Sequence, residues 1–224
     1  MSTDPIAAAK AEQERLRALL DLTDPGPAQP RFVAGLDVAY SIDDTRLAAA
    51  AVVLDTTTMT VVDEAVSVGA PAFPYVPGLF AFREVPGLLD ALGRLRVTPD
   101  LLVCDGHGLA HPRRFGLACH LGVLTGRPAI CVGKTPLLGE WAPPGSRRGE
   151  WSALVDAGEE IGRVVRTQDG VKPVFVSVGH RMSLDHAVSV ALALAPRYRL
   201  PETTRAADHL CRGALLRGPN RSGP

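Results

Sequence analysis

Hydrophobic runs alternate with polar turns along the first part of the chain and predict a β-meander. Three runs of apolar or β-branched residues, at 32–40, 47–55 and 60–68, are separated by short polar segments. This pattern is typical of three consecutive antiparallel strands. Apolar positions then recur with a helical period over residues 79–95, where Pro86 is expected to kink the helix or to restart it just after Glu84.

The rest of the chain alternates between short strands and helices. Residues 101–105 and 129–132 are expected to be buried strands, joined through a helix at 112–126 in a βαβ unit with a parallel pair. The further expected elements are a loop at 135–149, a hairpin of strands at 153–155 and 161–166, a strand at 174–178, and helices at 183–195 and 205–216. This element order is that of the ribonuclease H-like fold. We therefore predict an α/β protein with a central mixed β-sheet flanked by helices.

The two ends of the chain are expected to differ from this core. Residues 1–30 are expected to form an exposed helix, at 6–20, followed by a linker in which three prolines and one glycine fall within 23–30. Residues 209–224 are basic and contain Pro and Gly, so we expect a flexible tail there. Because the chain has 224 residues, 46% of them hydrophobic, we expect residues 1–224 to form a single domain.

Composition indicates a soluble, cytoplasmic protein without a membrane segment. The apolar stretches are shorter than the roughly 18 residues that a membrane span requires, and the N-terminus lacks a secretory segment. The four cysteines show no CxxC spacing. Basic and acidic residues balance at 24 each, so phosphate binding would have to come from local arginine clusters rather than from net charge.

Lysine is rare among the basic residues. Only Lys10, Lys134 and Lys172 are lysines among 24 basic residues. A compact ammonium differs chemically from a planar guanidinium. Lys134, in the buried-looking segment VGK, is therefore a candidate functional residue.

Two carboxylates lie in segments that are otherwise apolar. Asp37 is inside FVAGLDVAY and Asp105 ends LLVCD. A lone buried carboxylate is costly unless it is paired, and a hard cation with oxygen ligands would relieve both if the two strands are neighbours. Glu84, at the expected helix break, is a candidate third ligand. The alternative is that arginines pair with these acids, Arg113 or Arg114 with Asp105 and Arg83 with Glu84, and periodicity does not decide between the two.

Several sequence blocks together resemble the endonuclease V family. They are GLDVAY at 35–40, PYVPGLFAFREVP at 74–86, DGHGLAHPRRFGLACHLG at 105–122, GKTPL at 133–137, GHRMSLDHA at 179–187 and YRLPETTRAAD at 198–208. The resemblance implies a ribonuclease H-like, Mg²⁺-dependent DNA repair endonuclease, with Mn²⁺ as a substitute. It also implies a monomer that hydrolyses the second phosphodiester bond 3′ to deoxyinosine, leaving 3′-hydroxyl and 5′-phosphate ends.

The resemblance assigns roles to individual acidic and basic residues. Asp37, Glu84 and Asp105 match the metal-binding acids of the family, and Asp185 resembles a further acid near the metals. His111 and Lys134 match positions associated with the active site. Lys134 would neutralise charge on the reacting phosphate or orient the water. The alternatives are that His111 caps a helix and that Asp185 is a helix N-terminal acid favoured by the helix dipole.

The segment PYVP resembles the wedge of the family, an aromatic side chain that enters the base stack. Tyr75 is held between Pro74 and Pro77, which lowers the entropy lost on ordering. The alternative is a structured loop with Tyr75 packed on the core. The resemblance places an extruded hypoxanthine beside Gly78, Leu79, Phe80, Gly106 and Gly108. Candidate phosphate contacts are Arg113, Arg114, Arg147, Arg148, Arg181, Arg197, Arg199 and Arg205.

Three functions therefore stand as hypotheses. The first is a repair endonuclease that acts on deoxyinosine in DNA. The second is an endoribonuclease that acts on inosine in single-stranded RNA. The third is a metal-independent protein that binds nucleic acid through the wedge and the pocket without cleaving it.

Overall fold

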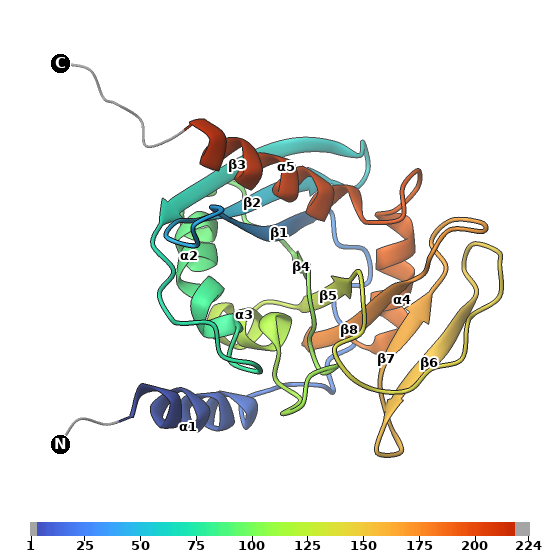
Figure 1. Ribbon diagram of the computed structural model, residues 1–224. Helices are drawn as coiled ribbons and strands as arrows, with labels where there is room; N and C mark the ends of the chain where they lie inside the picture. The colour runs from blue at the N-terminus through green and yellow to red at the C-terminus, as the bar shows by residue number, and fades with distance from the viewer. Residues whose placement is uncertain (1–3, 218–224) are drawn as a thin grey trace.

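The computed structural model describes residues 4–217 and has one mixed β-sheet at its centre (Figure 1). The strands lie in the order β3-β2-β1-β4-β5-β8-β7-β6. Their bounds are β1 Phe32–Tyr40, β2 Leu47–Asp55, β3 Thr60–Gly69, β4 Leu101–Cys104, β5 Ala129–Gly133, β6 Trp151–Asp156, β7 Glu159–Val165 and β8 Val174–His180. The helices are α1 Pro5–Arg17, α2 Ala81–Gly93, α3 Leu117–Thr125, α4 Leu184–Ala193 and α5 Glu202–Arg217.

The pairing of the first five strands confirms the predicted fold. β2 pairs antiparallel with β1 and with β3, which is the expected meander. β1 pairs with β4, and β4 with β5, in parallel. The order β3-β2-β1-β4-β5, with β2 alone reversed among these five, is that of the ribonuclease H-like fold. The carboxyl ends of β1, β4 and β5 therefore meet at one edge of the sheet.

Helices cover both faces of this part of the sheet. β2 is buried at every position, because Ala49 and Ala51 belong to the core under α2 whereas Ala48 and Ala50 belong to the core under α5. Successive side chains of a strand point to opposite faces, so a run of small apolar residues suits a strand with a helix on each side.

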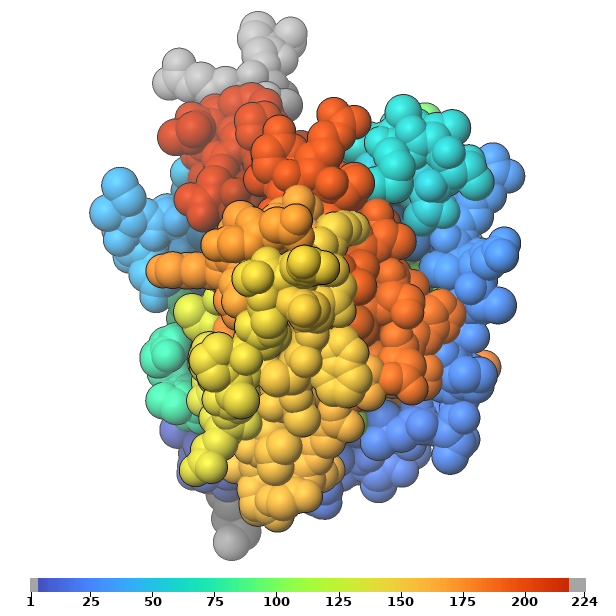
Figure 2. All heavy atoms as spheres, turned by 90° about the vertical axis from the view of Figure 1, so that its right-hand side faces the viewer, coloured from blue at the N-terminus to red at the C-terminus, as the bar shows by residue number. Residues whose placement is uncertain are grey.

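The other half of the sheet is covered by α3 and α4. Leu117 and Leu121 of α3 join the core under α2, and Val188 and Ala191 of α4 join a second core with β8. The β6–β7 hairpin forms the far edge and covers much of the face seen in Figure 2, where it is drawn in gold.

Some helix bounds differ from the expectations. α3 begins at Leu117 rather than at 112, because Arg114 has a left-handed backbone (φ 52°) and residues 112–116 form an irregular loop with a turn at its start. α2 continues through Pro86 instead of restarting after Glu84. α1 ends at Arg17 and is not exposed on all sides, since Gln13 and Leu16 are buried.

The C-terminal residues for which we expected a flexible tail continue a helix as far as the structure describes them. α5 runs to Arg217, and its Cys211 and Ala214 are buried against β2. Residues 218–224 lie outside the described residues. Among residues 4–217, no helix is both long enough and apolar enough to cross a membrane.

Candidate functional site

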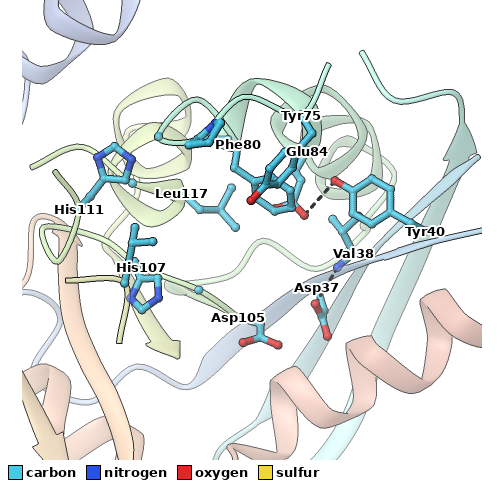
Figure 3. Close-up of a pocket in the computed structure, with 16 residues that line it drawn as sticks. Asp37, Val38, Tyr40, Tyr75, Phe80, Glu84, Asp105, His107, His111 and Leu117 are labelled. Atoms are coloured by element: carbon cyan, nitrogen blue, oxygen red, sulfur yellow. Dashed lines mark hydrogen bonds between the residues drawn. The ribbon is translucent and has the colours of Figure 1, made fainter. Parts of the chain in front are cut away.

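Asp37 and Asp105 lie side by side where β4 ends next to the middle of β1. The two strands are parallel with Leu36 opposite Cys104, so the next residue of each strand reaches the same level. The backbone N–H of Asp105 donates a hydrogen bond to the carbonyl of Leu36 (3.1 Å) and holds this register one residue further. Figure 3 shows the two carboxylates next to each other below the pocket. The predicted juxtaposition of these two acids is thus present.

Lys134 is the cation at this edge. It directly follows β5, the parallel neighbour of β4, and its Nζ forms an ion pair with the Asp105 carboxylate. The pKa of Asp37 is raised to about 7, mainly by burial and also by the nearby Asp105, while Lys134 acts in the opposite direction. The expected alternative, in which Arg113 or Arg114 pairs with Asp105, is therefore wrong.

Glu84 reaches the site from the first turn of α2. Its side chain is 6% exposed, and its Oε1 accepts a hydrogen bond from the Tyr40 hydroxyl (3.2 Å), as Figure 3 shows. Its pKa is raised to about 8, mainly by burial and also by the charges of Asp37 and Asp105, while the Tyr40 hydrogen bond acts in the opposite direction. Arg83, the alternative partner, instead forms an ion pair with Asp44 and lies over the Tyr40 ring.

The donor set fits a hard divalent cation. Among the described residues, no three His, Cys, Asp or Glu side chains are arranged closely enough to enclose a metal ion by themselves. Mg²⁺, however, is commonly held by one or two carboxylates and keeps several water molecules. Asp37 and Asp105 offer those two carboxylates, and the pKa values of Asp37 and Glu84 are raised mainly by burial and also by the neighbouring acids, so their charged forms are disfavoured. A bound cation would supply positive charge that favours these charged forms.

Asp208 is a further acid at this edge that the sequence analysis did not assign. It lies on α5, which packs against β1 and β2, and its charge contributes to raising the pKa of Asp37. The close packing of α5 needs Gly35, because a Cβ there would lie 2.2 Å from the backbone of Thr203. The position of Asp208 at the end of the block YRLPETTRAAD was the one available signal.

Asp185 lies elsewhere. Its side chain is 86% exposed and forms an ion pair with Arg163 of β7, and it is not among the residues that line the pocket beside Asp37 and Asp105. The structure therefore brings Asp208 toward the acids and leaves Asp185 outside the group.

A cavity of about 460 Å³ opens directly beside the carboxylates. The residues that line it and that the sequence analysis had singled out are Asp37, Glu84, Asp105, Tyr75, Pro77, Gly78, Phe80, Gly106 and His111. Its other lining residues are Val38, Tyr40, Ala81, His107, Gly116, Leu117 and Leu137. Leu79 and Gly108, which were expected beside the base, do not line it, and Leu79 is fully buried. Pro74 of the expected wedge and Arg113, a candidate phosphate contact, do not line it either.

Tyr75 stands at the mouth of the cavity. Its side chain is 68% exposed, and its ring packs edge-on against Phe80, with the ring centroids 5.8 Å apart. The alternative in which Tyr75 packs on the core is therefore wrong, since the side chain is largely exposed and its ring packs on the partly exposed Phe80 at the rim.

His111 lines the cavity as a neutral ring. Its pKa is lowered to about 4, mainly by burial and also by the positive charge of Arg113, while a hydrogen bond to the Gly78 backbone acts in the opposite direction. Its Nδ1 accepts a hydrogen bond from the backbone N–H of Arg113 (3.2 Å), so it stabilises the turn that precedes α3.

The two arginines of the segment HPRR are engaged within the protein. Arg113 donates to Gln13 and to the carbonyl of Gly78. Arg114 forms ion pairs with Asp156 and Glu159 at the tip of the β6–β7 hairpin, both at 2.7 Å. A phosphate at either position would compete with these contacts.

Comparison with known proteins gives one consistent family. The sequence pattern described as Endonuclease V matches residues 14–209. Endonuclease V of Streptomyces avermitilis is 57% identical over 208 residues, which is 92% of this chain and 91% of that protein. The crystal structure of an endonuclease V from the same organism superposes with a TM-score of 0.92 at 55% identity and covers 97% of this chain and 95% of that chain.

A more distant structure contains nucleic acid. The Ciona intestinalis endonuclease V (D234N), crystallised with a 23mer DNA containing an inosine followed by a ribo-adenosine, has a TM-score of 0.85 at 26% identity. The match covers 97% of this chain and 99% of that chain.

Proposed function

Because this chain belongs to the endonuclease V family, and is therefore an endonuclease that hydrolyses phosphodiester bonds, we propose that it nicks DNA at deoxyinosine. The observation that carries the proposal is one cavity that joins the carboxylates Asp37, Glu84 and Asp105 to an apolar slot behind Tyr75. The crystal structure of the Ciona protein with inosine-containing DNA supports the same substrate.

The slot suits an extruded purine. Apolar and aromatic side chains line it together with backbone at Gly78 and Gly106, so a base can be held by stacking and by hydrogen bonds to its edge. Tyr75, exposed at the mouth and flanked by prolines, enters the stack where the base leaves it. The base is thus held within the cavity that also contains the carboxylates.

The carboxylates hold Mg²⁺, for which Mn²⁺ substitutes. When bound there, the ion supplies a Lewis acid and an activated water for in-line attack on phosphorus. Asp37 and Asp105 provide the two adjacent carboxylates, and Glu84 and Asp208 contribute negative charge from α2 and α5. Lys134 reaches the same place with its ammonium group and neutralises charge on the reacting phosphate.

The bond that is cut is the second phosphodiester bond 3′ to the lesion, which leaves 3′-hydroxyl and 5′-phosphate ends. The family resemblance of the motifs supports this position, and the structure is consistent with a reacting phosphate close to the extruded base, because base slot and acids line one cavity.

Cleavage of inosine in RNA is the second candidate. The substrate in the Ciona structure carries a ribo-adenosine directly after the inosine, so that protein accepts a ribonucleotide near the lesion. Matched DNA and RNA oligonucleotides that differ only in the sugar separate the two activities.

One cleavage experiment tests the proposal. A labelled duplex with a single deoxyinosine is incubated with the protein and Mg²⁺, and a matched duplex has deoxyadenosine at the same position. We expect a single nick in the first duplex, none in the second, and none when EDTA removes the metal. Asp37→Asn is expected to bind the duplex without nicking it. Nicking in EDTA, or by Asp37→Asn, would contradict the metal assignment.

A further inference from the structure

Gln13 is a polar residue buried in the contact between α1 and the cavity wall. Its side chain is 1% exposed, and it lies one residue before the region that the family pattern matches. The amide Nε2 donates hydrogen bonds to the carbonyl of Phe115 (2.8 Å) and to the carbonyl of Gly78 (3.2 Å). The amide oxygen accepts a hydrogen bond from Nε of Arg113. The amide nitrogen and the amide oxygen of Gln13 are thus both hydrogen-bonded, and their partners lie on two loops that are distant in sequence.

Arg113 completes the same group of contacts. Its Nη2 donates to the carbonyl of Gly78, so Gln13 and Arg113 converge on one peptide oxygen. The backbone of Gly78 is left-handed (φ 76°), and a Cβ there would lie 2.9 Å from Nη2 of Arg113. The guanidinium therefore lies in space that any other residue at position 78 would fill.

This peptide is part of the wall of the cavity. Pro77 and Gly78 line the cavity, and the N–H of Leu79 donates to the carbonyl of Val76 (2.9 Å), which closes a tight turn at this corner. The side chains of Gln13 and Arg113 hold the Gly78 carbonyl from outside the turn. The orientation of the wall thus depends on a helix that does not itself line the cavity.

A fixed wall matters for the choice of base. Hypoxanthine and adenine are both purines and differ in the hydrogen-bonding groups of one edge, so a pocket distinguishes them only if its own donors and acceptors stay in place. If the Gly78 peptide turned freely, its carbonyl would offer an acceptor to the amino group of adenine.

We propose that Gln13, acting through Arg113 and the Gly78 carbonyl, is a positioning residue that determines the base selectivity of the cavity. This inference rests on the proposed function, because it concerns the site that is proposed to bind hypoxanthine. It assigns Arg113 to the support of the cavity wall, through the Gly78 carbonyl, rather than to a phosphate.

The test compares Gln13→Met with a control on the same helix. Methionine keeps the volume of glutamine and removes the hydrogen bonds. Leu16→Ala removes a side chain that is 2% exposed and packs on Phe115 and Cys119, so it loosens α1 without touching Gly78. The kcat and KM are measured on duplexes with deoxyinosine, deoxyadenosine or deoxyguanosine at the target position, together with the Tm of each variant.

We expect Gln13→Met to lower the preference for deoxyinosine over deoxyadenosine by about tenfold or more, with a higher KM for deoxyinosine and a kcat within about threefold of the parent. Leu16→Ala is expected to lower the Tm at least as much and to keep the preference. A parental preference in Gln13→Met, or an equal loss in Leu16→Ala, would overturn the inference.

Arg113→Lys is the second variant and serves if Gln13→Met does not fold. Lysine keeps the positive charge and loses the paired contacts to Gln13 and Gly78. Loss of preference is expected here too, whereas equally weaker binding to all three duplexes would identify a phosphate contact and overturn the inference. The parent alone tests the proposed function, because a parent without preference for deoxyinosine contradicts that function before any variant is examined.

Discussion

Lys134 and Asp105 form an ion pair at the ends of two adjacent parallel strands, β5 and β4. The ammonium group is thus held at the edge of the sheet where Asp37 and Asp105 bring negative charge together. A metal ion bound by Asp37 and Asp105 would lie close to the ammonium group of Lys134. The lysine must then share the Asp105 carboxylate with the metal or turn toward the phosphate.

Lys134→Met should therefore separate metal binding from catalysis. Removal of the ammonium frees Asp105, so the affinity for Mg²⁺ is expected to stay at or above that of the parent. The kcat is expected to fall by about 10²-fold or more, because charge on the reacting phosphate is no longer neutralised. Calorimetric titration with Mg²⁺ and single-turnover cleavage measure the two effects. A weaker affinity for Mg²⁺ with unchanged kcat would contradict this role.

Asp208 and Asp185 should differ sharply in their effect on activity. The negative charge of Asp208, on α5, contributes to raising the pKa of Asp37, whereas Asp185 is exposed and forms an ion pair with Arg163. Asp208→Asn is expected to lower kcat/KM by about 10- to 100-fold, as loss of a residue that tunes a metal site does. Asp185→Asn serves as the matched control and is expected to stay within about twofold of the parent. The opposite ranking would restore Asp185 as the further acid.

The sequence was sufficient for the fold and for the acids that lie on strands. Apolar runs and turn residues specified the meander, and the parallel pairing of β1 with β4 then placed Asp37 beside Asp105. Asp208 could not be predicted in this way. It lies on a helix whose contact with β1 depends on Gly35, and such a long-range contact leaves no periodic pattern near either residue.

Neither the contacts that Arg113 makes nor the start of α3 could be predicted from the sequence. Pro112 suggested a helix start, but the left-handed backbone of Arg114 delays the helix to Leu117. In that loop, Arg113 points toward Gln13 and donates a hydrogen bond to it. Because residues 6–20 were expected to form an exposed helix, a buried contact between Gln13 and Arg113 was not predicted. The backbone conformation of Arg114 decided the start of the helix, and a side-chain contact between distant segments decided the place of Arg113.

The contribution of Asp37 and Glu84 to the stability of the protein without metal should decrease as the pH rises from about 4 to 8. The pKa values of Asp37 and Glu84 in the folded protein are about 7 and about 8, above those of the unfolded chain, so the folded state binds more protons in this range. The stabilisation is complete below the unfolded pKa values and is lost as the pH passes the folded ones.

Mg²⁺ binds the ionised carboxylates and should reverse this loss. The difference in Tm between samples with Mg²⁺ and with EDTA is therefore expected to be larger at pH 8 than at pH 6. The double variant Asp37→Asn, Glu84→Gln lacks both groups and is expected to show little dependence on pH or metal. A Tm difference that shrinks with rising pH would contradict the assignment.

Protonation of His120 should lower the stability of the folded protein at acidic pH. Its ring is 4% exposed and packs against Phe82 and Phe115, with centroids 4.9 and 5.4 Å away, and burial lowers its pKa from 6.5 to about 4. The unfolded chain binds the proton first, so the contribution of His120 to stability is lost as the pH falls from about 6.5 to about 4, by up to about 3 kcal/mol. His120→Phe is expected to flatten this dependence in urea unfolding. The exposed His209→Phe is the control, and an unchanged slope in His120→Phe would contradict the prediction.

Tyr75→Ala should separate base extrusion from the chemical step. The side chain is 68% exposed and makes its ring contact with Phe80 at the rim, so the Tm is expected to change little. In a duplex the aromatic ring replaces stacking that the extruded base loses, and stacking on an aromatic side chain is worth about 1–3 kcal/mol. The kcat/KM for a deoxyinosine duplex is therefore expected to fall by about tenfold or more. A single strand with an unstacked inosine needs no wedge, so its cleavage should fall much less. An equal loss on both substrates would show that Tyr75 binds the base or the strand itself rather than opening the duplex.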